Sequence, residues 1–104
     1  MWLANESFNL LTVLFELQED LNKSISIQKQ ALSYNNTRGN VNEMFSNSTN
    51  ISKNYLKQGR TKEAMDVVEE TKPLLKKENN TMNKRIFVNT LSQVYEREGL
   101  EKKA

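Results

Sequence analysis

The chain of 104 residues contains no cysteine and no histidine. Without cysteine it can form no disulfide, thiolate nucleophile or cysteine-bound metal site. Without histidine it lacks the most frequent general base and the most frequent metal ligand. We therefore expect neither a cofactor nor a metal. A sequence without cysteine also fits a reducing compartment, so we predict a cytoplasmic protein, with a secreted or periplasmic sensor segment as the alternative.

Glycine and proline are rare, with three and one in the chain. So few glycines and prolines favour a few long helices over many short strands joined by tight turns. The longest apolar cluster, residues 10–17, is interrupted by Thr12 and Glu16. It is also far shorter than the ~20 apolar residues that cross a bilayer. The sequence therefore predicts an all-α protein with no contact to a membrane.

Positive and negative charges nearly cancel, since 15 Lys and Arg residues face 13 Asp and Glu residues. The two signs are interleaved along the chain, so no basic patch suited to nucleic acid is indicated. Carboxylates cluster at 16–20 and at 66–70, on predicted exposed faces among lysines. An acid–base pair needs two carboxyls that face a cleft with separated pKa values. We predict that the chain is not an enzyme.

An internal repeat with a spacing of 40 residues is the most informative feature. In each copy an aromatic residue follows an aliphatic one by four positions, and a hydroxyl residue lies directly after the aliphatic one. A small residue follows the aromatic by nine positions. Glycine lies four residues after the aromatic in two copies, where the first copy has Glu19. The copies are Leu11, Thr12, Phe15 and Ser24; Ile51, Ser52, Tyr55, Gly59 and Ala64; and Leu91, Ser92, Tyr95, Gly99 and Ala104.

Each shared position has a structural reason. The aliphatic and aromatic residues, four apart, lie on one face of a helix, and the small residue beside them allows a second helix to approach. Glycine can adopt the left-handed conformation that ends a helix. The second small residue falls in the next helix, where the two helices cross. The pattern predicts a helix, a tight turn and a second helix, repeated along the chain.

This pattern resembles the tetratricopeptide repeat family. The family signature has a large residue, then Leu, a small residue, Tyr, Gly four positions later and Ala five beyond it. The second and third copies fill these positions from the aliphatic residue onward, and the first copy fills most of them. The chain departs from the signature where tryptophan is usual, with Phe8, Ser48 and Val88 there. Its spacing of 40 also exceeds the ~34 residues of the usual unit, and is similar to that of bacterial peptide-sensing regulators.

The resemblance implies a right-handed α-solenoid of antiparallel helix pairs, a single segment over 1–104 with about 2.5 repeats. The repeats would cover about 5–40, 41–80 and an incomplete 81–104. In the family, the first helix of each repeat lines a concave groove that binds protein or peptide. An asparagine amide, which is both donor and acceptor, can pair with a peptide backbone there. The positions carried onto this chain are Asn9, Val13, Asn50, Lys53, Asn89 and Gln93. With 14 asparagines in the chain, composition bias is the alternative explanation.

Capping residues predict where the first helices begin and end. Asp20 is a candidate N-cap for the second helix. Asn40 with Glu43 has the spacing of a capping box for the third helix. The predicted helices span about 5–18, 20–34, 41–58, 61–72 and 81–98, with a loop at 35–40.

The last two predicted helices are bounded by a breaker and a cap. Pro73 removes a helical hydrogen bond, so it should kink the fourth helix or end it near Lys72. Asn80 or Thr81 should cap the fifth helix. Ala104 would then lie one turn into a sixth helix. The residues predicted to face inward are Phe8, Leu11, Leu14 and Phe15; Val41, Phe45, Ile51 and Tyr55; Ala64, Met65, Val68 and Leu75; and Ile86, Leu91, Val94 and Tyr95.

The resemblance and the lack of catalytic residues together predict a protein- or peptide-binding adaptor or sensor module. The alternative is a structural spacer or oligomerisation segment of a larger multidomain regulatory protein, and a docking part of an enzyme subunit is a third possibility. We also expect a homodimer through the incomplete C-terminal repeat. The partner helix of the fifth helix is missing after Ala104, so the apolar side chains there would need another cover.

Overall fold

A computed structural model describes residues 2–77 and 81–103 of the chain, with side chains for 4–77 and 81–101. These residues form five α-helices, one short 3-10 helix and no strand. The predicted all-α class is therefore confirmed. The elements are α1 (Trp2–Leu17), α2 (Leu21–Arg38), α3 (Val41–Lys57), α4 (Thr61–Thr71), the 3-10 helix η1 (Lys72–Lys76) and α5 (Met82–Lys103).

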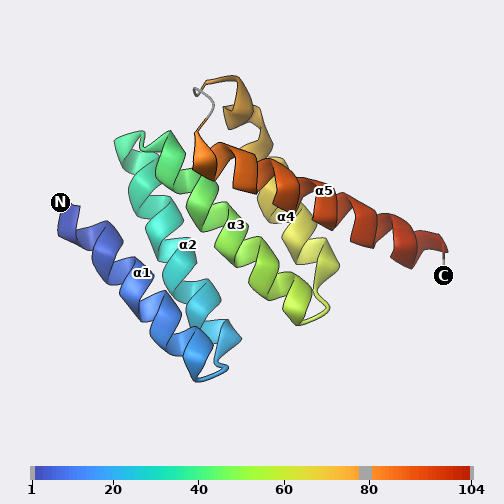
Figure 1. The fold of residues 1–104 in the computed structure, drawn as a ribbon, viewed down its shortest axis with the longest axis horizontal. Helices are drawn as coiled ribbons and strands as arrows, with labels where there is room; N and C mark the ends of the chain where they lie inside the picture. Colours follow the sequence, from blue (N-terminus) through green and yellow to red (C-terminus); the bar gives the residue numbers. More distant parts are fainter. Residues whose placement is uncertain (1, 78–80, 104) are drawn as a thin grey trace.

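Helix α3 is the centre of the packing. It contacts α2, α4 and α5, whereas α1 packs chiefly against α2. In Figure 1, α1, α2 and α3 lie side by side with alternating directions, α5 crosses at an angle, and the two termini lie at opposite ends. The molecule measures 46 × 35 × 20 Å along its principal axes.

The hydrophobic core is built from α2, α3, α4 and α5, and no residue of 4–17, the part of α1 with described side chains, belongs to it. Phe45 and Phe87 are fully buried, and their ring centroids lie 5.3 Å apart. The only described residue of α1 that is buried is polar, Thr12. The core is thus centred on α3 and displaced from α1. Its members are Ile25, Phe45, Ile51, Tyr55, Ala64, Val68, Phe87, Leu91 and Val94.

The turns α1–α2 and α3–α4 repeat the same backbone geometry 40 residues apart. Glu19 and Gly59 both adopt the left-handed conformation, with φ of 59° and 73°. The Asp20 amide donates to the Phe15 carbonyl at 2.8 Å, and the Arg60 amide donates to the Tyr55 carbonyl at 2.8 Å. The role predicted for Gly59 is confirmed, and a glutamate performs the same role in the first copy.

Gly99 was also predicted to end a helix, and this prediction is wrong. Gly99 lies inside α5, which continues to Lys103 without a break. A glycine inside a helix costs only ~1 kcal/mol relative to alanine, so the glycine alone does not end it. The predicted end near Glu98 and the predicted sixth helix are therefore wrong, and Ala104 lies outside the described residues.

The loop predicted at 35–40 is also wrong, because α2 continues to Arg38 and Gly39 ends it with φ of 70°. Asn35 is fully buried and belongs to the packed face of the helix. Asn40 does precede α3, but its side chain makes no capping bond. It donates instead to Asn35 Oδ1 at 3.1 Å. The predicted capping box is therefore wrong.

The remaining predicted boundaries hold. Asp20 accepts from the Lys23 amide at 3.2 Å and caps α2. Helix α4 ends at Thr71, two residues before Pro73, and continues as η1. Thr81 accepts from the Lys84 amide at 3.2 Å at the start of α5. Asn80, the other candidate cap, lies outside the described residues.

Three residues predicted to face inward are exposed: Leu11, Leu14 and Ile86, with 39%, 44% and 38% of their surface accessible. In α5 the fully buried Phe87 takes the inward position, because the face that meets the core carries residues 87, 91 and 94. In α1 the face toward α2 carries Thr12 with half-buried Phe8 and Phe15, and the two leucines lie beside or opposite it.

Candidate binding surfaces

The six predicted site residues lie on the odd-numbered helices, two each on α1, α3 and α5. Five are exposed and Asn50 is half-buried. Because α3 packs against α5, the structure brings the pairs on these two helices onto neighbouring elements. The pair on α1 lies on a helix that packs chiefly against α2. We call this set the odd-helix face: Asn9, Val13, Asn50, Lys53, Asn89 and Gln93.

The polar side chains of the odd-helix face have free hydrogen-bonding groups. Within the described part of the chain, none of them makes a side-chain hydrogen bond or an ion pair; they are Asn9, Asn50, Lys53, Asn89 and Gln93. Gln93 also lines a cavity of about 230 Å³ together with Leu56, Glu96, Arg97 and Leu100. These groups are therefore available to another molecule.

A different group of amides is buried between α1, α2 and α3. Asn35 Nδ2 donates to Asn47 Oδ1 at 2.9 Å, and Asn47 Nδ2 donates to Gln28 Oε1 at 3.0 Å. Gln28 Nε2 donates in turn to Thr12 Oγ1 at 2.6 Å. Gln28, Asn35 and Asn47 are at most 2% exposed. We call this chain of bonds the amide network.

Further bonds extend the amide network along α1 and α3. Asn5 and Asn35 donate to each other at 3.2 and 2.9 Å. Asn54, which is 1% exposed, donates to Ser24 Oγ at 2.9 Å and to Glu16 Oε2 at 3.2 Å. Most of the buried amide groups are paired in this way, although Asn54 Oδ1 is buried without a partner. Because unpaired buried polar groups are costly, these bonds favour one arrangement of α1 and α2 on α3.

The amide network was not predicted, although the sequence carries part of its signal. Asn47 and Asn54 are seven residues apart on one predicted helix, and Gln28 and Asn35 are seven apart, although Asn35 was predicted to lie in the loop and the structure places it on α2. Residues at this spacing lie on one helix face. Asn9, Asn50 and Asn89 of the odd-helix face have no amide residue seven positions away on the same helix.

The repeat register shows that the equivalent contact between the second hairpin and α5 is apolar. Forty residues after Asn47 and Asn54 stand Phe87 and Val94, both fully buried. Forty residues after Ser24, Gln28 and Asn35 stand apolar residues of the second hairpin, namely Ala64, Val68 and Leu75. We call the α2–α3 contact the polar joint and the α4–α5 contact the apolar joint.

A groove runs between α2 and α4 with α3 as its floor. Three adjoining cavities of about 520, 340 and 270 Å³ all include Lys29 in their lining. The floor is Ile51 and Tyr55. We call it the α2–α4 groove; one wall carries Lys29, Leu32 and Ser33, and the other carries Glu63, Asp66, Val67 and Glu70.

The positive charges of this groove are held close to Tyr55. Lys29 Nζ lies 5.3 Å and the Arg60 guanidinium 4.7 Å from the ring centroid. Arg60 Nε also pairs with Glu63 Oε2 at 2.8 Å, and this hydrogen bond lowers the pKa of Glu63. In the described chain, Asp66 and Glu70 make neither an ion pair nor a side-chain hydrogen bond. The α4 wall therefore carries uncompensated negative charge.

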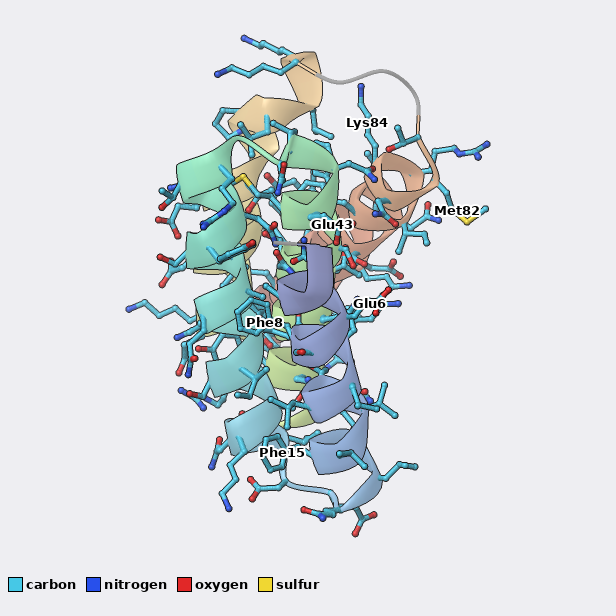
Figure 2. The ribbon with its side chains drawn as sticks, turned by 90° about the vertical axis from the view of Figure 1, so that its left-hand side faces the viewer. Glu6, Phe8, Phe15, Glu43, Met82 and Lys84 are labelled. Carbon is cyan, nitrogen blue, oxygen red and sulfur yellow. The ribbon has the colours of Figure 1, made fainter. Side chains whose placement is uncertain are left out.

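Helix α1 exposes a stripe of aliphatic side chains opposite its packed face. Leu10, Val13, Leu14 and Leu17 are 62%, 50%, 44% and 77% exposed, at positions i, i+3, i+4 and i+7. Figure 2 shows Phe8 and Phe15 on the side of α1 that faces α2, and Glu6 on the opposite side. We call the four residues the α1 stripe. A contiguous row of exposed aliphatic residues is typical of a contact surface.

No group of three potential metal ligands occurs among the described residues. In the same residues no helix has the length and hydrophobicity needed to cross a membrane. No family model, no curated protein and no solved structure matches the chain. The groups that these surfaces offer are suited to hydrogen bonding, ion pairing and apolar burial.

Proposed function

We propose that the chain is a protein-binding adaptor or sensor module of tetratricopeptide type, a right-handed solenoid that holds a peptide along its odd-helix face. The observation that carries the proposal is the contrast between two sets of asparagines. Those between the helices are paired within the chain, whereas Asn9, Asn50 and Asn89 are unpaired on three successive odd-numbered helices. Composition bias is the alternative explanation, because exposed Asn36 on α2 is unpaired as well.

The repeated turn geometry supports the tetratricopeptide part of the proposal. The left-handed residue recurs at 19 and 59, and the small residues Ser24 and Ala64, five positions later, are both completely buried. Small residues at these positions allow the antiparallel helices of each hairpin to approach closely. This is the structural reason that the family signature requires them.

The binding free energy at the odd-helix face would be a sum of small contributions from single contacts. Each amide that pairs with a peptide backbone contributes ~0.5–1.5 kcal/mol, so several contacts are needed for micromolar affinity. Lys53 is exposed and can pair with a carboxylate of the peptide. A peptide with a free carboxyl group or an acidic side chain is therefore the expected ligand.

Selection from a random peptide library displayed on phage tests the proposal. We expect Asn50→Ala to weaken a selected peptide by ~1 kcal/mol, about fivefold in Kd, because one backbone pair is lost. The matched control is Gln18→Ala, an exposed amide just beyond the end of α1 and outside both proposed binding surfaces. Equal effects of the two substitutions would contradict binding at the odd-helix face and support composition bias.

The α1 stripe favours the second candidate function, an oligomerisation segment. The C-terminal helix is less favourable than its sequence indicates, because Leu91 and Val94 are buried within the chain. Its exposed large apolar residues are Met82, Ile86, Val88 and Leu100. Sedimentation at micromolar concentration distinguishes the two ends. Leu10→Lys with Leu17→Lys should abolish any dimer formed by α1, and Ile86→Lys with Leu100→Lys should abolish one formed by α5. A wild-type chain that stays monomeric would exclude self-association at either end under these conditions.

A further inference from the structure

We propose that the α2–α4 groove is a second binding surface, separate from the odd-helix face, and that it binds a short amphipathic helix with lysine or arginine along one flank. The proposal does not depend on the function proposed for the odd-helix face. It rests on the shape of the groove, on its chemistry and on the position of its unpaired charges.

The shape of the groove suits a helix. Its two walls are helices and its floor is a third, so all three backbones already satisfy their own hydrogen bonds. An extended peptide would find no free strand edge there, whereas a helix brings its backbone bonds with it. Half-buried Leu32 and Val67 face each other across the buried floor residues Ile51 and Tyr55. Apolar side chains of a docked helix would cover this strip.

The charges of the groove select a basic flank. The groove's own cations, Lys29 and Arg60, are both drawn to the Tyr55 ring, and Arg60 is also paired with Glu63. Asp66 and Glu70 remain unpaired on the α4 wall, in the part of the chain that the structure describes. Since the whole chain has a net charge of +2, the attraction for a cation is local to this wall.

The spacing of the acidic residues matches a helical ligand. Glu63, Asp66 and Glu70 are separated by three and four residues on α4. At a rise of ~1.5 Å per residue these steps are about 4.5 and 6 Å along the helix axis. Lysines at i, i+3 and i+7 of a second helix, lying alongside α4, recur with the same steps.

The probe is a fluorescein-labelled peptide with leucine at every third or fourth position and lysine along one flank. Its binding to the full chain is followed by fluorescence anisotropy at low ionic strength. Asp66→Asn with Glu70→Gln should weaken binding about five- to tenfold, because two exposed ion pairs are lost. Lys29→Gln should strengthen binding about twofold, because a cation that repels the lysines is removed.

Glu6→Gln with Glu96→Gln is the matched control, because it changes the net charge equally at two exposed sites on α1 and α5. It should leave the affinity unchanged, as should Asn50→Ala on the odd-helix face. A version of the peptide with a central proline, which breaks its helix, should bind at least tenfold more weakly.

Amide chemical shifts of the labelled protein locate the peptide. Shifts confined to α2, α4 and Tyr55 support the groove, and shifts confined to α1 would show that the leucines had bound the α1 stripe and would overturn the proposal. Equal loss of affinity in the Asp66/Glu70 and Glu6/Glu96 variants would also overturn it, since the attraction would then be general. Neither result bears on peptide binding at the odd-helix face.

Discussion

Glu19 and Gly59 perform the same structural role with different strain. Both are left-handed, but a residue with a Cβ atom pays ~1–2 kcal/mol for this conformation. Glu19→Gly should raise the free energy of unfolding by up to about 1 kcal/mol, after the larger entropy of glycine in the unfolded chain is subtracted. Gly59→Ala should lower it by about 1 kcal/mol, and the space around Gly59 is open, so the backbone alone sets this cost. Urea denaturation measures both, and a destabilised Glu19→Gly variant would contradict the argument.

The Arg60–Glu63 pair gives a second test on single residues. The hydrogen bond from Arg60 is the main reason that the pKa of Glu63 is lowered. A lowered pKa in the folded state means that the pair stabilises the fold above the ordinary carboxyl pKa, and that this contribution is lost as the pH falls through the lowered pKa. Arg60→Gln should raise the pKa of Glu63 toward its ordinary value, as followed by carboxyl ¹³C shifts. Arg97→Gln, on α5, should leave it unchanged.

Between elements, the amide network makes the polar joint sensitive to single substitutions. Asn47→Ala would leave the Gln28 carbonyl oxygen buried without the partner seen here, while Asn35 Nδ2 would lose one of its two acceptors and keep Asn5 Oδ1. An unpaired buried polar group costs ~1–3 kcal/mol, so we expect a loss of about 1–3 kcal/mol in stability. Asn89→Ala is the control, because Asn89 is exposed and unpaired and should cost less than about 0.5 kcal/mol. Thermal unfolding followed by circular dichroism measures both variants. Equal losses of stability in the two variants would contradict the role of the network.

The sequence was sufficient for the existence of the five α-helices and for several of their boundaries, and insufficient for the faces that they bury. Asp20, Pro73 and Thr81 act locally, and each bounds its helix as predicted. Gly59 and Gly99 were both predicted to end a helix, yet only Gly59 does so, because tertiary packing decides whether the chain continues. The prediction that Leu14 and Ile86 face inward was wrong because it assumed that large apolar residues are buried. In α1 the one buried residue among those described is polar, Thr12, and the hydrogen bond from Gln28 on α2 makes its burial favourable.

For the molecule as a whole, the position of the core predicts that α1 is the least stable helix. Its residues with described side chains, 4–17, contribute nothing to the core cluster. Their contacts with the rest of the chain include the Phe8–Tyr34 ring pair at 5.7 Å and the amide network. Hydrogen exchange should therefore show α1 amides opening at a lower free energy than those of α3, which lies at the centre of the packing. Amides of α1 and α3 that exchange together, at the free energy of global unfolding, would contradict this.

The odd-helix face stays a prediction at this scale, because its residues are defined by a resemblance and no bound molecule tests them. The sequence could suggest these positions because they recur on successive helices. It could not suggest the α2–α4 groove, whose lining comes from three helices with no common spacing. Surfaces of that kind follow from the packing of distant segments.

The difference between the polar and apolar joints has a consequence for the ancestry of the chain. If the repeats arose by duplication, the copies are no longer interchangeable, because the second hairpin would present Ala64, Val68 and Leu75 to Asn47 and Asn54. Both amides would then be buried against hydrocarbon. Conversely, the first hairpin would set Gln28 and Asn35 against Phe87 and Val94. The contact surface of each hairpin therefore matches only its present neighbour. A chain with the same hairpins in a shuffled or circularly rearranged order should fail to fold.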